Sequence, residues 1–390
     1  MINCFYLYAV VWSGILLLYS LNLSEYSQPL SIDVYIFLIV TILISIIIGT
    51  CLRKKFFFKR VKTSDKKVNK LSVVFLTILF LLNVIYMKDI PLFTLGKKES
   101  YGSMSGLPFF LVLLYIYGIF FALKNIYYFL CSNFKRKEFF IAFLFVEIIF
   151  LLLFSRSQLL ISILGAGFIL LSYLESENKI KIKYVILTFA LLAIGLYFFG
   201  VLGNIRCGYK PLDCSFITIL GRIKKWPGFI PKSYQWAYTY AITPLSNLDL
   251  NIRSVKPINN FIALISELFP ETFTKRLIGN QMIIKTAQHY SVLTATSAFT
   301  NAYVTFGIMG AYIVYICLCM NVFIGLWWNT KVNDEQFSTL FFSYMTVIFV
   351  FTVFENPLKF TATALVIYII FLSSIVNNFV GKKNIKFIYK

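Results

Sequence analysis

The sequence predicts an all-α, polytopic integral membrane protein with about ten transmembrane helices and one large outward loop. Of its 390 residues, 59% are hydrophobic and only 14% are charged, whereas soluble domains carry about 25% charged residues. Apolar runs of about 20 residues recur along the chain, and this length crosses the hydrocarbon core of a bilayer. The runs do not alternate between apolar and polar positions, so they favour helices over the strands of a membrane β-barrel.

The predicted membrane helices follow one another through short connectors, with one exception. The first helix has no basic residues before it and no small-residue cleavage site after it, so we interpret it as a retained span rather than a signal peptide. The predicted spans are 4–22, 31–52, 71–87, 107–130, 139–154, 157–174, 184–202, 298–326, 339–354 and 360–379.

The exception is the hydrophilic stretch 203–297, which interrupts the apolar pattern. It divides the chain into a membrane region 1–202, a loop 203–297 and a membrane region 298–390. Two parts of this loop, 215–225 and 259–278, interleave apolar and polar residues, the second with a break at Pro270. We expect both parts to form amphipathic helices that lie in the headgroup region.

The net charge of +21 comes from 37 Lys and Arg against 16 Asp and Glu. In a soluble protein this excess would suggest a nucleic-acid partner, but here the positive-inside rule accounts for it. Twenty Lys and Arg lie in alternate connectors and the C-terminal tail, against five in the short connectors opposite. Both termini are therefore predicted to be cytoplasmic and the loop 203–297 to lie outside. Its own cations do not contradict this, because long loops translocate largely regardless of charge.

Neither a metal site nor a cofactor is predicted. Five of the seven cysteines lie in or beside spans and are expected to act as small packing residues. Cys207 and Cys214 both lie in the outward loop, where the compartment permits disulfides, and their spacing leaves a bridge and two free thiols equally open. The chain has one histidine and lacks P-loop, HExxH and GxSxG motifs, so ATP-driven transport and zinc or serine hydrolysis are unsupported.

Arg156 is the strongest candidate for a functional side chain. It lies in the tight turn 155–157 between two predicted spans, where an ionisable residue beside hydrocarbon is costly and often functional. A guanidinium group matches phosphate in geometry, although an arginine that reaches to lipid headgroups is the alternative. Arg206 follows the seventh span, near Gly200, Gly203 and Gly208, and we expect an anion site with Arg156 if the two helix ends meet. The alternative for Arg206 is an interfacial anchor followed by turn glycines.

Other titratable residues of the outer face are weaker candidates. His289 is the only histidine, and it is either a general base near neutral pH or a structural hydrogen-bonding residue. Glu355 is either a base or a polar cap before Pro357. Arg222 and Arg253 are candidates for substrate binding or for solvated charges.

Several motifs occur in an order that is similar to one family. They are Ile90–Phe93 before Tyr101, Arg156 with Gly167 at Arg-x10-Gly spacing, Trp236–Tyr240 followed by Pro244–Leu248, and Thr294-Ala295 before Tyr303 and Phe306-Gly307-x-x-Gly310. With its many spans and one dominant outward loop, the chain resembles the Wzy-type oligosaccharide repeat-unit polymerases, the O-antigen polymerases. It departs from that pattern in one respect, because the residue eleven positions after Arg206 is Ile217 and not glycine.

The resemblance implies an enzyme of the bacterial inner membrane with a large periplasmic loop. Such an enzyme transfers a growing glycan from undecaprenyl pyrophosphate to a hydroxyl of the next lipid-linked repeat unit, without a metal or cofactor. Arginines would bind the pyrophosphates, His289 or Glu355 would take the proton, and Trp236, Tyr238 and Tyr240 would stack on sugars. A chain-length regulator, a flippase and membrane lipids are the other implied partners.

Two other functions compete with polymerisation. An O-antigen ligase would carry a loop histidine shortly before Gly-x-x-Gly, whereas Gly307 lies eighteen positions after His289. A lipid-linked oligosaccharide flippase, or another secondary transporter, would carry its charges within the spans. In this chain the strongest charges are predicted at the outer rim.

Overall fold

The computed structural model describes residues 3–56, 58–94, 106–179, 182–278, 284–290, 293–332 and 334–388. Within these ranges the regular secondary structure is helical, apart from an isolated antiparallel bridge between Ser24 and Ile223. The helices are α1 (Cys4–Ser20), α2 (Ile32–Cys51), α3 (Lys70–Met87), the 3-10 helix η1 (Pro91–Thr94), α4 (Pro108–Cys131), α5 (Lys137–Leu152), α6 (Arg156–Ser176), α7 (Ile182–Arg206), α8 (Ser215–Leu220), α9 (Tyr234–Ser254), α10 (Phe261–Leu268), α11 (Glu271–Ile278), α12 (Thr300–Lys331), α13 (Glu335–Phe351) and α14 (Thr361–Ile388). The predicted helical class is confirmed.

Each of the ten predicted spans corresponds to a helix of the structure. In the part of the chain that the structure describes, six helices are long and apolar enough to cross a membrane, namely α2, α3, α4, α6, α12 and residues Thr361–Phe379 of α14. Helices α1 and α13 are apolar but shorter, at 17 residues each. The chain is therefore a helical membrane protein.

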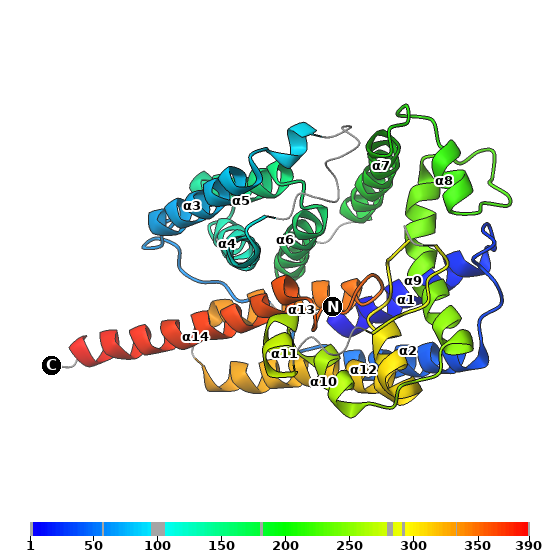
Figure 1. Ribbon diagram of the computed structural model, residues 1–390. Helices are drawn as coiled ribbons and strands as arrows, with labels where there is room; N and C mark the ends of the chain where they lie inside the picture. Colours follow the sequence, from blue (N-terminus) through cyan, green and yellow to red (C-terminus); the bar gives the residue numbers. More distant parts are fainter. Residues whose placement is uncertain are drawn as a thin grey trace.

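Helix α13 lies at the centre of the arrangement (Figure 1). It packs against α1 and α12 on one side and against α6 and α14 on the other. Its side chains are buried along almost the whole length. Just beyond its end, Thr352 accepts a hydrogen bond of 3.0 Å from the indole of Trp12 in α1. Helices α3, α4 and α5 form the outer part of the α6 side, with α4 also packed against α14.

Helix α9 was not predicted from the sequence. It belongs to the hydrophilic stretch 203–297, yet it packs against α1, α2, α7 and α12 rather than lying apart from the bundle (Figure 1). Its apolar residues are interspersed with Thr, Ser, Asn and Asp, so it lacks the uniform apolar character of a membrane span. The predicted boundary between 202 and 203 falls inside α7, which continues to Arg206.

Glycines on α7 allow α9 to approach closely. A Cβ atom at Gly200 would lie 2.0 Å from the backbone oxygen of Ser233, and one at Gly203 would lie 2.7 Å from the Trp236 ring. The Trp236 indole then donates to Asn204 Oδ1 at 2.7 Å. At Gly200 and Gly203 the space predicted for an anion is occupied by the start of α9, whereas Gly208, with a positive φ of 80°, has open space beside it.

Helix α12, predicted as one continuous span, contains a kink at Phe306 and Gly307. Gly307 has φ 65° and ψ −162°, a conformation that is essentially restricted to glycine. The kink leaves carbonyls without helical partners, and the strand-like segment before α10 uses two of them: Ile258 N–H donates to Val304 and Asn260 N–H donates to Thr305, each at 2.9 Å. Gly307 is thus a backbone requirement of this junction.

The two predicted amphipathic stretches differ in outcome. Over 259–278 the structure has α10 and α11 with the expected break before Pro270, and Phe261, Ile262, Phe273 and Leu277 are exposed. Over 215–225 the predicted helix is wrong beyond Leu220. There Arg222 adopts a positive φ of 43°, and Lys224 N–H donates to Leu23 at 2.9 Å. This stretch pairs with the α1–α2 connector, which satisfies its backbone groups better than a solvated helix end.

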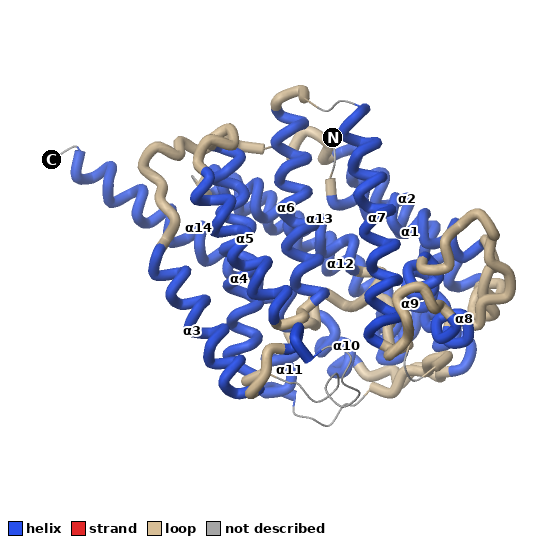
Figure 2. The backbone as a smooth tube through the Cα atoms, turned by 90° about the horizontal axis from the view of Figure 1, so that it is seen from above, coloured by secondary structure: helices blue, strands red, loops and turns tan. Residues whose placement is uncertain are grey.

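Both chain ends lie toward one side of the bundle, whereas α8, α10 and α11 lie toward the other (Figure 2). The first turn of α6 and the last turns of α5 and α7 also belong to the side of α10 and α11, because consecutive spans alternate in direction. We call this side the outer rim, defined by residues 155–156, 206–278, 284–290, 293–297 and 352–360.

Gly203→Ala is expected to destabilise the protein by about 1–3 kcal/mol, because a methyl group would overlap the Trp236 ring and overpacked helices must shift. Thermal unfolding in detergent, followed by tryptophan fluorescence, measures the change. Gly195→Ala is the matched control on the same helix, where a Cβ meets nothing within 4 Å. That variant should be neutral or up to about 1 kcal/mol more stable. Equal effects of the two substitutions would contradict this account of the α7–α9 contact.

Candidate functional site

Arg156 begins α6 directly after a tight turn at the end of α5. The turn closes by a Schellman pattern, in which Phe154 N–H donates to Leu151 and Ser155 N–H donates to Phe150, both at 2.9 Å. Phe154 adopts a positive φ of 52°, which a bulky residue rarely does. The Arg156 guanidinium lies over the Phe154 ring, 5.4 Å from its centre. The turn therefore holds the arginine at the outer rim.

Arg156 and Arg206 both lie at helix ends on the outer rim, Arg156 as the first residue of α6 and Arg206 as the last residue of α7. Arg206 is the last residue of α7, and Cys207 follows it. Burial raises the pKa of the Cys207 thiol, while the positive charges of Arg206 and Arg156 both act to lower it. The two guanidinium groups come from consecutive helices and lie on the same side of the bundle, and the anion site between them stays a prediction. We call Arg156 and Arg206 the rim arginines.

A second group of side chains surrounds His289. The His289 ring packs against the Tyr26 ring at 4.8 Å between centres, and the Arg222 guanidinium lies 5.9 Å from the same tyrosine ring. Ser246 Oγ on α9 lies 2.7 Å from His289 Nε2. We call His289, Tyr26, Ser246 and Arg222 the histidine cluster. It unites two residues predicted from the sequence with two that were not.

Two asparagines of α9 hold the backbone around His289. Asn247 Nδ2 donates to the carbonyls of Leu293 and Ala295, at 3.2 and 2.9 Å, and its Oδ1 accepts from His289 N–H at 3.2 Å. One turn later Asn251 makes a reciprocal pair with the backbone of Ala287, at 2.8 Å in each direction. The amides form a ladder that fixes the segment carrying the histidine.

Arg253, predicted as a substrate-binding residue, makes contacts that join two parts of the fold. Arg253 Nε lies 2.7 Å from Asp249 Oδ2, and its Nη2 donates to the Pro29 carbonyl. Asp249 Oδ1 in turn accepts from Ser31 N–H at 2.7 Å, at the start of α2. These contacts tie α9 to the α1–α2 connector, so they account for Arg253 without a ligand. Arg222 pairs with Glu25 at 3.4 Å, and both side chains are more than half exposed.

The aromatic residues predicted to stack on sugars are mostly enclosed. Trp236 is 4% exposed and Tyr238 is 6% exposed. The hydroxyl of Tyr238 accepts from Leu23 N–H at 3.1 Å, and Tyr240, half-buried, contacts Phe199 edge-on at 5.4 Å. Packing between α9, α7 and the α1–α2 connector covers these rings. The sequence pattern was that of an exposed aromatic belt, but the rings instead join helices.

Glu355 lies in the connector between α13 and α14. Burial raises its pKa to about 7, against a weak opposing hydrogen bond of 3.5 Å from Thr363. At neutral pH it can therefore accept or release a proton. Nearby, Lys359 makes a 2.6 Å ion pair with Glu267 of α10, whose side chain is fully buried. This pair anchors α10 to the same connector and was not predicted.

The thiols of Cys207 and Cys214 are both free, so the bridge left open by the sequence is not formed. Cys214 is buried and accepts from Asn204 Nδ2 at 3.4 Å. Among the described residues, no three His, Cys, Asp or Glu side chains gather as metal ligands would.

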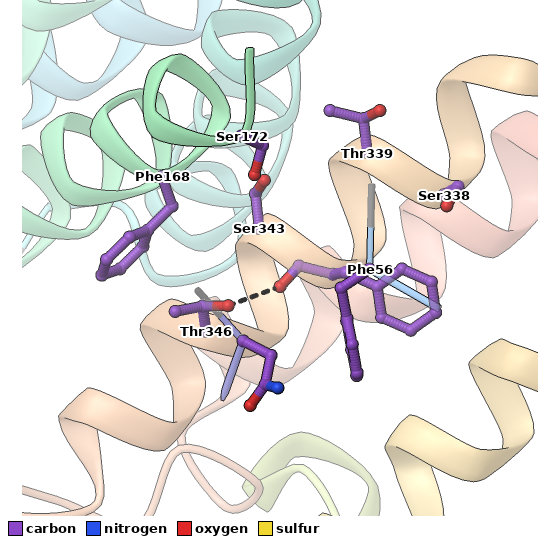
Figure 3. Close-up of a pocket in the computed structure, with 9 residues that line it drawn as sticks. Phe56, Phe168, Ser172, Ser338, Thr339, Ser343 and Thr346 are labelled. Atoms are coloured by element: carbon purple, nitrogen blue, oxygen red, sulfur yellow. Dashed lines mark hydrogen bonds between the residues drawn. The ribbon is translucent and has the colours of Figure 1, made fainter. Parts of the chain in front are cut away.

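A small polar pocket lies between α6 and α13, away from the outer rim (Figure 3). Its lining residues are Asn3, Phe56, Phe168, Ser172, Ser338, Thr339, Phe342, Ser343 and Thr346. The cavity of about 20 Å³ has room for a single water molecule. The buried Ser338 hydroxyl, which lacks a partner among the described residues, would bind it. None of the predicted site residues lines this pocket.

No protein-family profile, curated protein or solved structure matches the chain. The function must therefore be argued from the chain's own residues.

Glu355→Gln is expected to stabilise the protein at pH 8 by up to about 3 kcal/mol, since a raised pKa of about 7 means that ionised Glu355 disfavours the folded state. In the wild type, stability should fall as the pH rises from about 4.5 to about 7, where only the folded state retains the proton. Unfolding temperatures of both proteins at pH 5 and pH 8 test this, and the difference should nearly vanish at the lower pH. A greater gain at pH 5 would contradict the assigned shift.

Proposed function

We propose that the chain is a membrane glycosyltransferase that polymerises undecaprenyl-pyrophosphate-linked oligosaccharide repeat units into O-antigen or a similar surface polysaccharide. The observation that carries the proposal is the position of Arg156 at the start of α6 and of Arg206 at the end of α7, both on the outer rim. The family resemblance of the motif order supports the same reaction.

Glycosyl transfer from a lipid diphosphate needs positive charges at the membrane surface. A lipid diphosphate places its charge just outside the hydrocarbon core and its chain within the core. Arginines at helix ends can donate in a bidentate manner to the phosphate oxygens, and they offset the charge that grows as the glycosidic bond breaks. The exposed apolar residues Leu160 and Ile163 on α6 and Phe198 and Leu202 on α7 would face lipid below the rim arginines.

The transfer also needs a proton acceptor for the attacking hydroxyl. The oxygen of an acceptor hydroxyl attacks the anomeric carbon of the donor glycan, and the bond from that carbon to the diphosphate oxygen breaks. The electron pair leaves with the diphosphate, and the hydroxyl proton passes to a base. His289 and Glu355 remain the two candidates, since burial lowers the pKa of His289, which favours the neutral imidazole, and raises the pKa of Glu355 to about 7.

The proposed location is the bacterial inner membrane, with the outer rim in the periplasm and both termini in the cytoplasm. The distribution of Lys and Arg supports this orientation. A chain-length regulator and a flippase are the expected protein partners. A ligase or a flippase is the competing assignment, and the phenotype of a deletion separates them.

Deleting the gene should leave a single repeat unit on the final acceptor, because ligation and flipping continue while polymerisation stops. Glycan length on a gel gives the answer, with the plasmid-borne wild type as the control. Complete loss of the product would instead favour a ligase or a flippase, and an unchanged ladder would end the proposal.

Arg156→Ala is expected to lower chain extension by about 100- to 1,000-fold, the effect of removing one donor that stabilises transition-state charge. Arg156→Lys should be intermediate, since it keeps the charge and loses the bidentate geometry. Arg276→Ala is the matched control, because Arg276 is an exposed arginine of the same outer face. A normal ladder from Arg156→Ala at equal membrane levels would rule out its role.

Cysteine labelling tests the proposed orientation of the protein in the membrane. In a cysteine-free background, Lys232→Cys should react with a membrane-impermeant maleimide added to cells with a permeable outer membrane, whereas Lys179→Cys should react only after lysis. Both lysines are exposed, so access depends on the side of the membrane alone. The opposite pattern would place the rim arginines in the cytosol and defeat the proposed reaction.

A further inference from the structure

The hydrogen bonds around Ser246 determine which nitrogen of His289 carries a proton. Ser246 Oγ lies 2.7 Å from the carbonyl oxygen of Tyr26 and 2.7 Å from His289 Nε2. A carbonyl oxygen only accepts, so the single hydroxyl proton of Ser246 must point to Tyr26. The hydroxyl can then only accept from the ring, and Nε2 must be the protonated nitrogen.

We propose that Ser246 is a positioning residue that holds neutral His289 in the Nε2–H tautomer, leaving Nδ1 as the atom that takes the proton of the acceptor hydroxyl. This proposal rests on the proposed function for the role of Nδ1, but not for the tautomer. It also excludes Ser246 as a nucleophile activated by His289, because its proton is committed to a carbonyl.

The surroundings keep the ring in place and uncharged. Tyr26 packs on one ring face, and Asn247 accepts from the His289 backbone N–H at 3.2 Å. Burial lowers the pKa of His289, and the nearby positive charge of Arg222 acts in the same direction, while a hydrogen bond with the Ser246 backbone and the negative charge of Asp249 oppose this shift. At neutral pH the imidazole is therefore a neutral base with its lone pair on Nδ1.

The charged and titratable groups near the ring come from four segments of the chain. Arg222 follows α8 and pairs with Glu25 of the α1–α2 connector, Asp249 is on α9 and pairs with Arg253, and Tyr290 follows in the chain. Because each carboxylate is paired with an arginine, the net influence on His289 comes mainly from burial. Within the described part of the chain, Nδ1 makes no hydrogen bond, so it is available to a substrate.

The sole histidine makes a direct test possible. Protein labelled with [15N]histidine gives one pair of imidazole signals, and a solid-state spectrum in lipid at pH 8 should show Nε2 protonated and Nδ1 unprotonated. Ser246→Ala should shift the tautomer ratio toward Nδ1–H by roughly two- to tenfold, the amount that one ordinary hydrogen bond sustains. Ser254→Ala is the matched control, since its hydroxyl bonds only to Leu250 of its own helix.

The activity measurement uses the same variants. His289→Gln should lower chain extension about 100-fold or more. Ser246→Ala should lower the plateau rate by roughly two- to tenfold. It should also move the acidic limb of the pH profile to lower pH. The hydrogen bond to Ser246 stabilises the charged imidazolium more than the neutral ring, so its loss lowers the pKa of His289. Ser246→Thr, which keeps the hydroxyl, should restore both quantities.

Three results would overturn the proposal. They are an Nδ1–H tautomer in the wild type, a tautomer ratio unchanged by Ser246→Ala, and full chain extension by His289→Gln. Failure of the proposed function is distinguishable, because the deletion would then leave long glycans intact while the nitrogen spectrum still decides the tautomer. If Ser246→Ala does not fold, the wild-type spectrum and Ser246→Thr still test the hydrogen-bond assignment.

Discussion

The close contact between α7 and α9 is the constraint on which the outer rim depends. Gly200 and Gly203 let the backbone of α9 and the Trp236 ring approach α7 without a gap. From there α9 reaches α1, α2 and α12. One helix thereby sets the end of α7, where Arg206 lies, and also carries Ser246 and the asparagines that hold His289. The positions of Arg206 and of the histidine cluster therefore both depend on the packing of α9 against α7.

Much of the helical framework follows from elementary patterns. Long apolar runs specify helices wherever a bilayer removes the alternative of hydrogen bonding to water. Pro270 ends one short helix and starts another, as a residue without a backbone N–H must. The placement of Arg156 and Arg206 on the same side of the bundle was also predictable, because both were expected at the same ends of consecutive spans. These features depend on local composition and on the alternating direction of consecutive spans, and both can be inferred from a single sequence.

The features that escaped prediction depend on partners distant in sequence. Nothing local shows that Trp236 and Tyr238 would be covered, since their spacing also suits an exposed aromatic belt. Ser246 and Asn247 look like ordinary polar residues until the backbone of Tyr26 and of Ala295 is placed beside them. A partial signal did exist, because polar amides at positions 247 and 251 recur at helical spacing within an otherwise half-apolar helix. The kink at Gly307 is similar, since its freed carbonyls are useful only because the segment before α10 passes beside them.

The amide ladder of Asn247 and Asn251 contacts main-chain atoms of the segment that bears the histidine. These hydrogen bonds do not depend on which side chains the segment carries, because they contact only its backbone. Replacement of neighbouring residues in this segment would alter the chemical lining of the rim while leaving the imidazole where it is. The arrangement therefore makes the position of the imidazole independent of the neighbouring side chains.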